Sequence, residues 1–255
     1  MNELMDVKKR SYFAIIAYLI VYLVIGSILT VLLIKHYVND LYDYKTIMNA
    51  TTEVSGVKEL DRIAAAINTY SMVLIYVPLA IILTTIMFLD LKEDCKKIKE
   101  KPLFFTLLSI IGGIAFFLIS IGLSKLSVKI CGETSTNETV LESVFNFKKY
   151  GVIMLLVTSI CGPIVEELIY RKAIFNIFND KPKWVPIIVS ILAFAIPHMI
   201  STTGVGALSF IVISIPYLFA GTMLAFAYEY SGRNVYVTMI MHFINNLVTC
   251  IILLV

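Results

Sequence analysis

The chain has 255 residues and a formal net charge of +3, and 59% of its residues are hydrophobic while only 15% are charged. Its mean hydropathy is +0.88. Soluble globular domains carry about 45–50% apolar and about 25% charged residues. The composition therefore excludes an ordinary soluble domain and predicts a polytopic protein whose partner is the lipid bilayer. The small positive charge indicates membrane topology, and we expect no nucleic-acid partner.

Apolar runs long enough to cross a bilayer as helices, about 20 residues each, recur along the chain. They predict an all-α transmembrane bundle of about seven spans, with an eighth left open. The first run is too long for a signal peptide and no small-residue cleavage site follows it, so we interpret it as a retained span. The expected spans cover roughly residues 12–34, 71–89, 103–125, 152–178, 185–200, 207–228 and 235–254.

Lys and Arg are concentrated in short segments that fall on one predicted side of the membrane. They occur before the first span, in "DLKEDCKKIKEKP" with its five lysines, between Arg171 and Lys183, and at Arg233. The two longer loops, about 36–70 and 126–149, carry mixed charge. The positive-inside rule then predicts a multi-pass cell-membrane protein with a cytoplasmic N-terminus, and seven spans place the C-terminus outside.

The chain divides into an N-terminal membrane region, residues 1–149, and a four-span core, residues 150–255. The N-terminal region contains three spans and the two long outer loops. The unusual polar residues lie in the core. The stretch "SICGPIVEELIYRKAIF" carries Glu166, Glu167 and Arg171 inside an apolar helix that continues to Phe178. This extension puts both glutamates about 20 Å from the cytoplasmic helix end.

A charged side chain at that depth costs at least about 2.5–3.5 kcal/mol, so it normally faces protein or a wet cavity. Glu167 and Arg171 are four residues apart on one helix face and can pair. Glu166 points about 100° away and has no partner on its own helix. We therefore expect Glu166 to do chemistry and Glu167 with Arg171 to support it, although the residues alone also allow the reverse.

Two of the three histidines, His198 in "FAIPHMI" and His242 in "MIMHFINNL", lie within predicted spans. Asn246 follows His242 by four residues, on the same helix face. Rises along the helices place all three near the depth of Glu166. The sequence thus predicts a buried pocket with one or two carboxylates, two imidazoles and an amide.

Such a set suits hydrolysis of a peptide bond by two routes. A carboxylate and an imidazole can activate water, while Asn and a second His stabilise the oxyanion. Alternatively, Glu166, His198 and His242 form a zinc ligand set in which the bound water is the nucleophile. The sequence leaves the zinc route and the metal-independent route open.

Three motifs stand in order on successive helices: "EELIYR" fits EExxxR, "FAIPH" fits FxxxH and "HFINN" fits HxxxN. In this the chain resembles the CPBP family of intramembrane proteases, also called the CAAX-protease and bacteriocin-processing (Abi) family, which includes type II CAAX prenyl endopeptidases. The resemblance implies that Glu166 activates water together with His198. It makes His242 and Asn246 the partner and oxyanion-stabilising groups, and adds Phe194 to the supporting residues.

The predicted function is an intramembrane endopeptidase of the metallo- or glutamate type. Its substrate would be a membrane-associated or lipid-modified protein or peptide. The alternative is a non-catalytic membrane binding protein or bacteriocin self-immunity protein, in which the same polar groups hold a partner. A third interpretation, an ion or proton transporter, also uses buried Glu and His, but the chain lacks the internal repeats typical of transporters.

Overall fold

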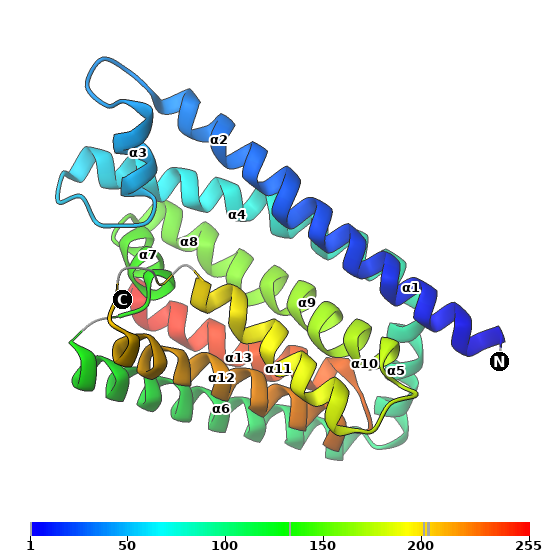
Figure 1. The fold of residues 1–255 in the computed structure, drawn as a ribbon. Helices are drawn as coiled ribbons and strands as arrows, with labels where there is room; N and C mark the ends of the chain where they lie inside the picture. Colours follow the sequence, from blue (N-terminus) through cyan, green and yellow to red (C-terminus); the bar gives the residue numbers. More distant parts are fainter. Residues whose placement is uncertain (1, 133, 201, 203–204) are drawn as a thin grey trace.

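The computed structural model describes residues 2–132, 134–200, 202 and 205–255. In this part of the chain all regular secondary structure is helical (Figure 1). The η elements are π-helical turns within longer helices. The elements are α1 (Asn2–Leu19), η1 (Ile20–Ile25), α2 (Gly26–Tyr37), α3 (Tyr44–Ala50), α4 (Lys58–Ile86), α5 (Phe88–Glu100), α6 (Pro102–Cys131), α7 (Thr136–Phe145), α8 (Lys148–Leu156), η2 (Val157–Cys161), α9 (Gly162–Glu166), η3 (Glu167–Ala173), α10 (Ile174–Ile177), α11 (Trp184–Ile200), α12 (Ala207–Tyr230) and α13 (Val235–Leu254).

The length and composition of these helices confirm an all-α, polytopic membrane bundle. Within the described residues, six helices are long and apolar enough to cross a bilayer, and the 17-residue helix α11 is shorter but equally apolar. A bilayer requires about 17–25 helical residues. The six are Val7–Tyr37, Lys58–Ile86, Pro102–Cys131, Lys148–Ile177, Ala207–Tyr230 and Val235–Leu254.

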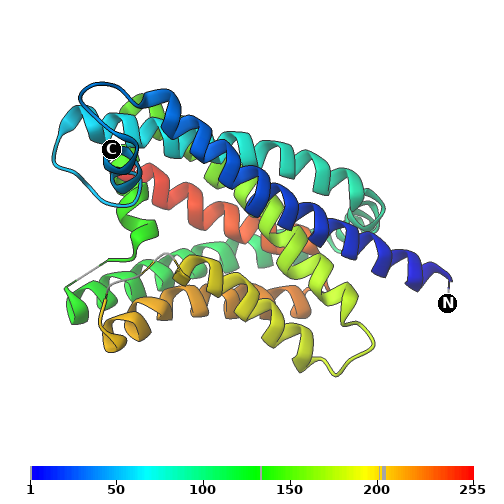
Figure 2. The same ribbon diagram turned by 45° about the horizontal axis from the view of Figure 1, so that its top comes forward.

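The two chain termini lie at opposite ends of the bundle (Figure 1). The N-terminal end also holds α5 and the turn between α10 and α11, whereas α3, α7 and the C-terminus lie together at the other end. Helix α11 runs between the two ends beside α12 (Figures 1 and 2). The basic segments of the sequence therefore meet at one end of the molecule.

The first long loop is more helical than the sequence indicated. Helix α4 begins at Lys58, well before residue 71, and α3 occupies another part of the segment. The early turns of α4 bury Ile63 and Ile67 against Ile34 and Ile47. Polar residues between these apolar ones lower the hydropathy of the segment, which is why it resembles a loop in the sequence.

The helix that carries the two glutamates is the most enclosed of the six. Half of the most apolar window of Lys148–Ile177 is buried, compared with 11% for Val7–Tyr37. Apart from its few charged residues its sequence is apolar all round, as expected for a helix surrounded by protein. Two π-helical turns, η2 and η3, interrupt it, and such turns are frequent at functional sites.

Candidate active site

Glu167 is the centre of the buried polar set, with no exposed surface. Its Oε1 accepts a hydrogen bond from His242 Nδ1 at 3.0 Å, and its Oε2 lies 3.2 Å from Arg171 Nε. The predicted pairing of Glu167 with Arg171 is thus present. Because a carboxylate accepts hydrogen bonds, Nδ1 of His242 carries the proton and Nε2 points to the other side of the ring.

Arg171 is also fully buried, so its charge is compensated entirely by protein groups. Its guanidinium lies over the Phe194 ring, 4.7 Å from the centroid, and one amino group reaches the Gly221 carbonyl at 3.5 Å. A cation over an aromatic face is stabilised further where water is absent. Phe194, predicted as a supporting residue, therefore holds the guanidinium that neutralises Glu167.

Glu166 ends α9 and faces the other nitrogen of His242. Its Oε2 lies 3.9 Å from His242 Nε2 and, among the described residues, has no hydrogen-bond partner. The residue is nevertheless buried. Buried polar atoms normally have partners, and the exceptions are often atoms with a chemical role. The two adjacent glutamates thus occupy different environments on opposite sides of one imidazole.

Four tyrosines, Tyr18, Tyr22, Tyr76 and Tyr170, form a contacting cluster beside the helix that carries Glu166, and the sequence interpretation missed it. The hydroxyls of Tyr18 and Tyr170 are 2.9 Å apart, and the Tyr22 ring stacks on that of Tyr18 at 5.2 Å. Tyr18, Tyr22 and Tyr76 come from α1, η1 and α4. The N-terminal region therefore forms one wall of the site.

His198 lies near the carboxylate–imidazole group, and the Phe194 ring contacts both His198 and His242. The Phe194 centroid is 5.0 Å from that of His198 and 5.8 Å from that of His242. The His198 Nδ1–H donates to the Phe194 carbonyl at 2.9 Å, and the Tyr217 ring stacks on the imidazole at 5.2 Å. A donating Nδ1 leaves a lone pair on Nε2 in the neutral ring.

Asn246 lies one helical turn after His242. It contacts the helix Lys148–Ile177 at Thr158, about two turns before Glu166. Its Nδ2 donates to the Thr158 carbonyl at 2.9 Å. Thr158 belongs to the π-helical turn η2, where the ladder of backbone hydrogen bonds is irregular. An amide nitrogen carries two N–H bonds, and the contact with Thr158 uses only one of them.

A catalytic zinc centre requires three protein ligands arranged around one point. No group of three or more His, Cys, Asp or Glu residues is arranged to hold a metal ion in the part of the chain that the structure describes. The Nδ1 atoms of both histidines are engaged with Glu167 and with the Phe194 carbonyl. The zinc ligand set Glu166, His198 and His242 remains a prediction.

The site thus lies inside a membrane-embedded helix bundle and joins two buried carboxylates to one imidazole. Comparison with known families adds a further finding. A model of the family "Type II CAAX prenyl endopeptidase Rce1-like" matches residues 148–248. The match is consistent with the CPBP family that the three motifs predicted, and the matched residues include every motif residue. No curated protein and no solved structure matches the chain significantly.

Proposed function

We propose that the protein is an intramembrane endopeptidase in which Glu166 activates the attacking water. The observation that carries this proposal is the position of His242 between two glutamates, 3.0 Å from one and 3.9 Å from the other. Glu167 Oε2 has an ion pair with Arg171, whereas Glu166 Oε2 has neither a hydrogen bond nor a Lys or Arg partner in the described part of the site. An unpaired buried carboxylate beside an oriented imidazole is suited to proton transfer.

In the proposed reaction, a water molecule gives a proton to Glu166 while its oxygen attacks the carbonyl carbon of the peptide bond. His198, which lies near the carboxylate–imidazole group, orients the same water. The carbonyl electrons move onto oxygen, and His242 and Asn246 donate hydrogen bonds to this oxyanion. The C–N bond then breaks, and the leaving amine takes the proton that Glu166 received.

Glu167 orients His242 and stabilises its protonated form, as a carboxylate does for the histidine of a catalytic triad. If zinc is bound, Glu166, His198 and His242 would be its ligands, and the metal would lower the pKa of its bound water. Sensitivity to a chelator, with recovery on adding zinc, separates these routes. Activity that is unchanged by exhaustive chelation supports the metal-independent glutamate route.

The proposed substrate is a membrane-associated or lipid-modified protein or peptide. A site enclosed by membrane-spanning helices is reached most directly from the bilayer, which favours a substrate that is itself held there. We also propose that the end of the bundle that holds the N-terminus, α5 and the other basic segments (the basic end) faces the cytoplasm. This orientation predicts that the cleaved segment approaches from the membrane or its cytoplasmic surface.

The test compares purified, detergent-solubilised wild type with Glu166→Gln, His198→Ala and His242→Ala on a library of free and prenylated peptides. We expect each substitution to reduce turnover about 100-fold or more. His36→Ala is the matched control, because His36 is exposed at the far end of α2. Cleavage that survives all three site substitutions would refute the proposed site.

The non-catalytic alternative makes a different prediction in the same assay. A binding or immunity protein would retain a peptide on the purified protein without producing fragments. It would also tolerate Glu166→Gln, which preserves the shape of the side chain. Biological activity that persists in this variant would therefore favour the alternative.

A further inference from the structure

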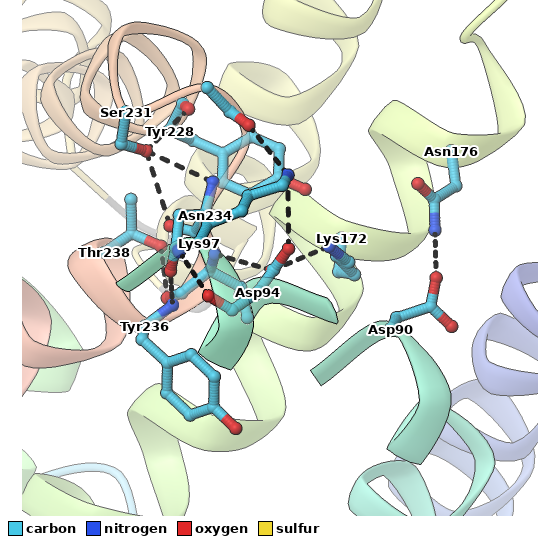
Figure 3. Close-up of polar contacts among 12 residues, drawn as sticks. Asp90, Asp94, Lys97, Lys172, Asn176, Tyr228, Ser231, Asn234, Tyr236 and Thr238 are labelled. Atoms are coloured by element: carbon cyan, nitrogen blue, oxygen red, sulfur yellow. Dashed lines mark hydrogen bonds and ion pairs between the residues drawn. The ribbon is translucent and has the colours of Figure 1, made fainter. Parts of the chain in front are cut away.

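Helix α5 lies at the end of the bundle where the N-terminus lies (Figure 1), and it carries the buried Asp94 (Figure 3). Only 1% of Asp94 is exposed, although the neighbouring lysines of α5 reach solvent. A buried carboxylate requires partners to offset the cost of desolvation. Asp94 has Lys97 on its own helix at 3.5 Å, and its closer partners come from two other helices that both lead to the candidate active site.

One oxygen of Asp94 joins the two helices. Its Oδ2 lies 2.7 Å from Nζ of Lys172 and accepts the backbone N–H of Val235 at 3.0 Å. The backbone carbonyl of Asp94 accepts a further hydrogen bond from Asn234 Nδ2 at 2.8 Å. Figure 3 shows these contacts converging on Asp94 from the glutamate helix and from the start of α13.

Asp94 thus supplements Asn234, the N-cap of α13, by accepting the first N–H of this helix from a distant segment of the chain. The first N–H groups of a helix have no partner within the helix, and an anion at this end interacts favourably with the helix dipole. The same anion compensates the Lys172 ammonium, which is buried and cannot rely on water. A single carboxylate therefore fixes the end of α13 against η3.

The positions of these contacts connect them to the site. Lys172 directly follows Arg171 and lies about 7.5 Å along the helix from Glu167, and Val235 lies about 10.5 Å along α13 from His242. The two helices are therefore joined through Asp94 near one end, through the Glu167–His242 hydrogen bond further in, and through Asn246 and Thr158 beyond it. A hydrogen bond tolerates little axial displacement of either helix.

We propose that Asp94 is a positioning residue for the active site: it sets the axial relation of η3 and α13 so that His242 lies between Glu166 and Glu167. This role rests on the proposed function for its catalytic consequence. In this role helix α5, the basic segment between α4 and α6, supports catalysis as well as setting the membrane topology. A misplacement of about 1 Å at a reacting group can reduce turnover about 100-fold.

Asp90 provides the matched control on the same helix. It is also buried, but it pairs with Arg10 at 3.0 Å and contacts Asn176 at 3.4 Å, and so joins α5 to α1 and α10. None of these contacts reaches α13. Asp90→Asn therefore removes a comparable ion pair without releasing the helix that carries His242.

The experiment follows the three histidines of the full chain by NMR, using protein labelled with ¹⁵N-histidine in detergent micelles. His36→Gln and His198→Gln assign the signals. We expect Asp94→Asn to shift the His242 ring signals and Asp90→Asn to leave them in place. Lys172→Met should act like Asp94→Asn, whereas Lys172→Arg, which keeps a cation, should restore the wild-type spectrum. Lys172→Met also provides a test if Asp94→Asn does not fold.

With a peptide that the wild type cleaves, the rate of turnover gives a second measurement. Asp94→Asn is expected to lower kcat about 100-fold while KM changes little, because substrate contacts are retained. His242 signals that stay unchanged in both Asp94→Asn and Lys172→Met, or that shift equally in Asp90→Asn, would overturn the proposal. If the wild type cleaves no peptide but the shift appears, the proposed function fails while the positioning link stands.

Discussion

Glu167 and His242 share a 3.0 Å hydrogen bond between residues that are 75 positions apart in the chain. The bond links the helix of the EExxxR motif to the helix of the HxxxN motif. The other oxygen of Glu167 faces Arg171 at 3.2 Å. Glu167 is therefore held from both sides, and its negative charge fixes the orientation of the imidazole that also faces Glu166.

The first prediction concerns the charge of Glu167. Glu167→Gln keeps the size of the side chain but leaves Arg171 buried without an anion. Loss of one partner of a buried ion pair costs about 3–5 kcal/mol, so we expect a clear fall in thermal stability together with loss of turnover. Thermal unfolding in detergent and peptide cleavage measure the two effects.

Glu59→Gln is the control for this prediction. Glu59 and Arg62 form an ion pair at 2.6 Å, but both side chains are about half exposed at the start of α4. Exposed pairs contribute little to stability. No measurable change in unfolding temperature is expected in this variant. An equal loss in the two variants would show that burial does not determine the effect.

The second prediction concerns the hydroxyls of Tyr18 and Tyr170, which are 2.9 Å apart. Each single change to Phe leaves the remaining hydroxyl buried without its partner, at a cost of about 1–3 kcal/mol. The double variant removes both groups, so its loss should be smaller than the sum of the single losses. Unfolding of the four proteins in a double-mutant cycle measures this coupling, and strict additivity would contradict it.

The third prediction concerns the ring that stacks on His198. Tyr217 also shares a 2.6 Å hydrogen bond with Ser135, the N-cap of α7. Tyr217→Phe retains the stacking and loses this bond, whereas Tyr217→Leu loses both. We expect turnover and the His198 NMR signal to change mainly in Tyr217→Leu. Equal effects in both variants would assign the role to the hydroxyl instead.

The fold and the centre of the site could be predicted because their signals are local. Span lengths follow from hydropathy alone, and the pairing of Glu167 with Arg171 follows from the geometry of one helix. Distances along the predicted helices indicated that Glu166 and His242 lie at a similar depth in the membrane. These arguments need only the rise per residue and the cost of a charge in lipid.

The remaining features depend on contacts between distant segments. Tyr18 and Tyr76 resemble ordinary apolar-helix residues in the sequence, and only packing places them beside the helix that carries Glu166. Asp94 lies among lysines, where a surface position is the natural expectation, yet Lys172 and Val235 bury it. Depth estimates also placed His198 near His242 without revealing that the Phe194 ring contacts both of them.

The last prediction tests the orientation of the bundle through a native cysteine. Cys95 is exposed on α5, at the end that we propose is cytoplasmic. In a variant that keeps Cys95 as its sole cysteine, a membrane-impermeant maleimide should label inverted vesicles and spare intact cells. Leu41→Cys in a cysteine-free background is the opposite control, because Leu41 is 83% exposed between α2 and α3. Labelling of Cys95 from outside intact cells would reverse the orientation and move the basic end, with Asp94, away from the cytoplasm.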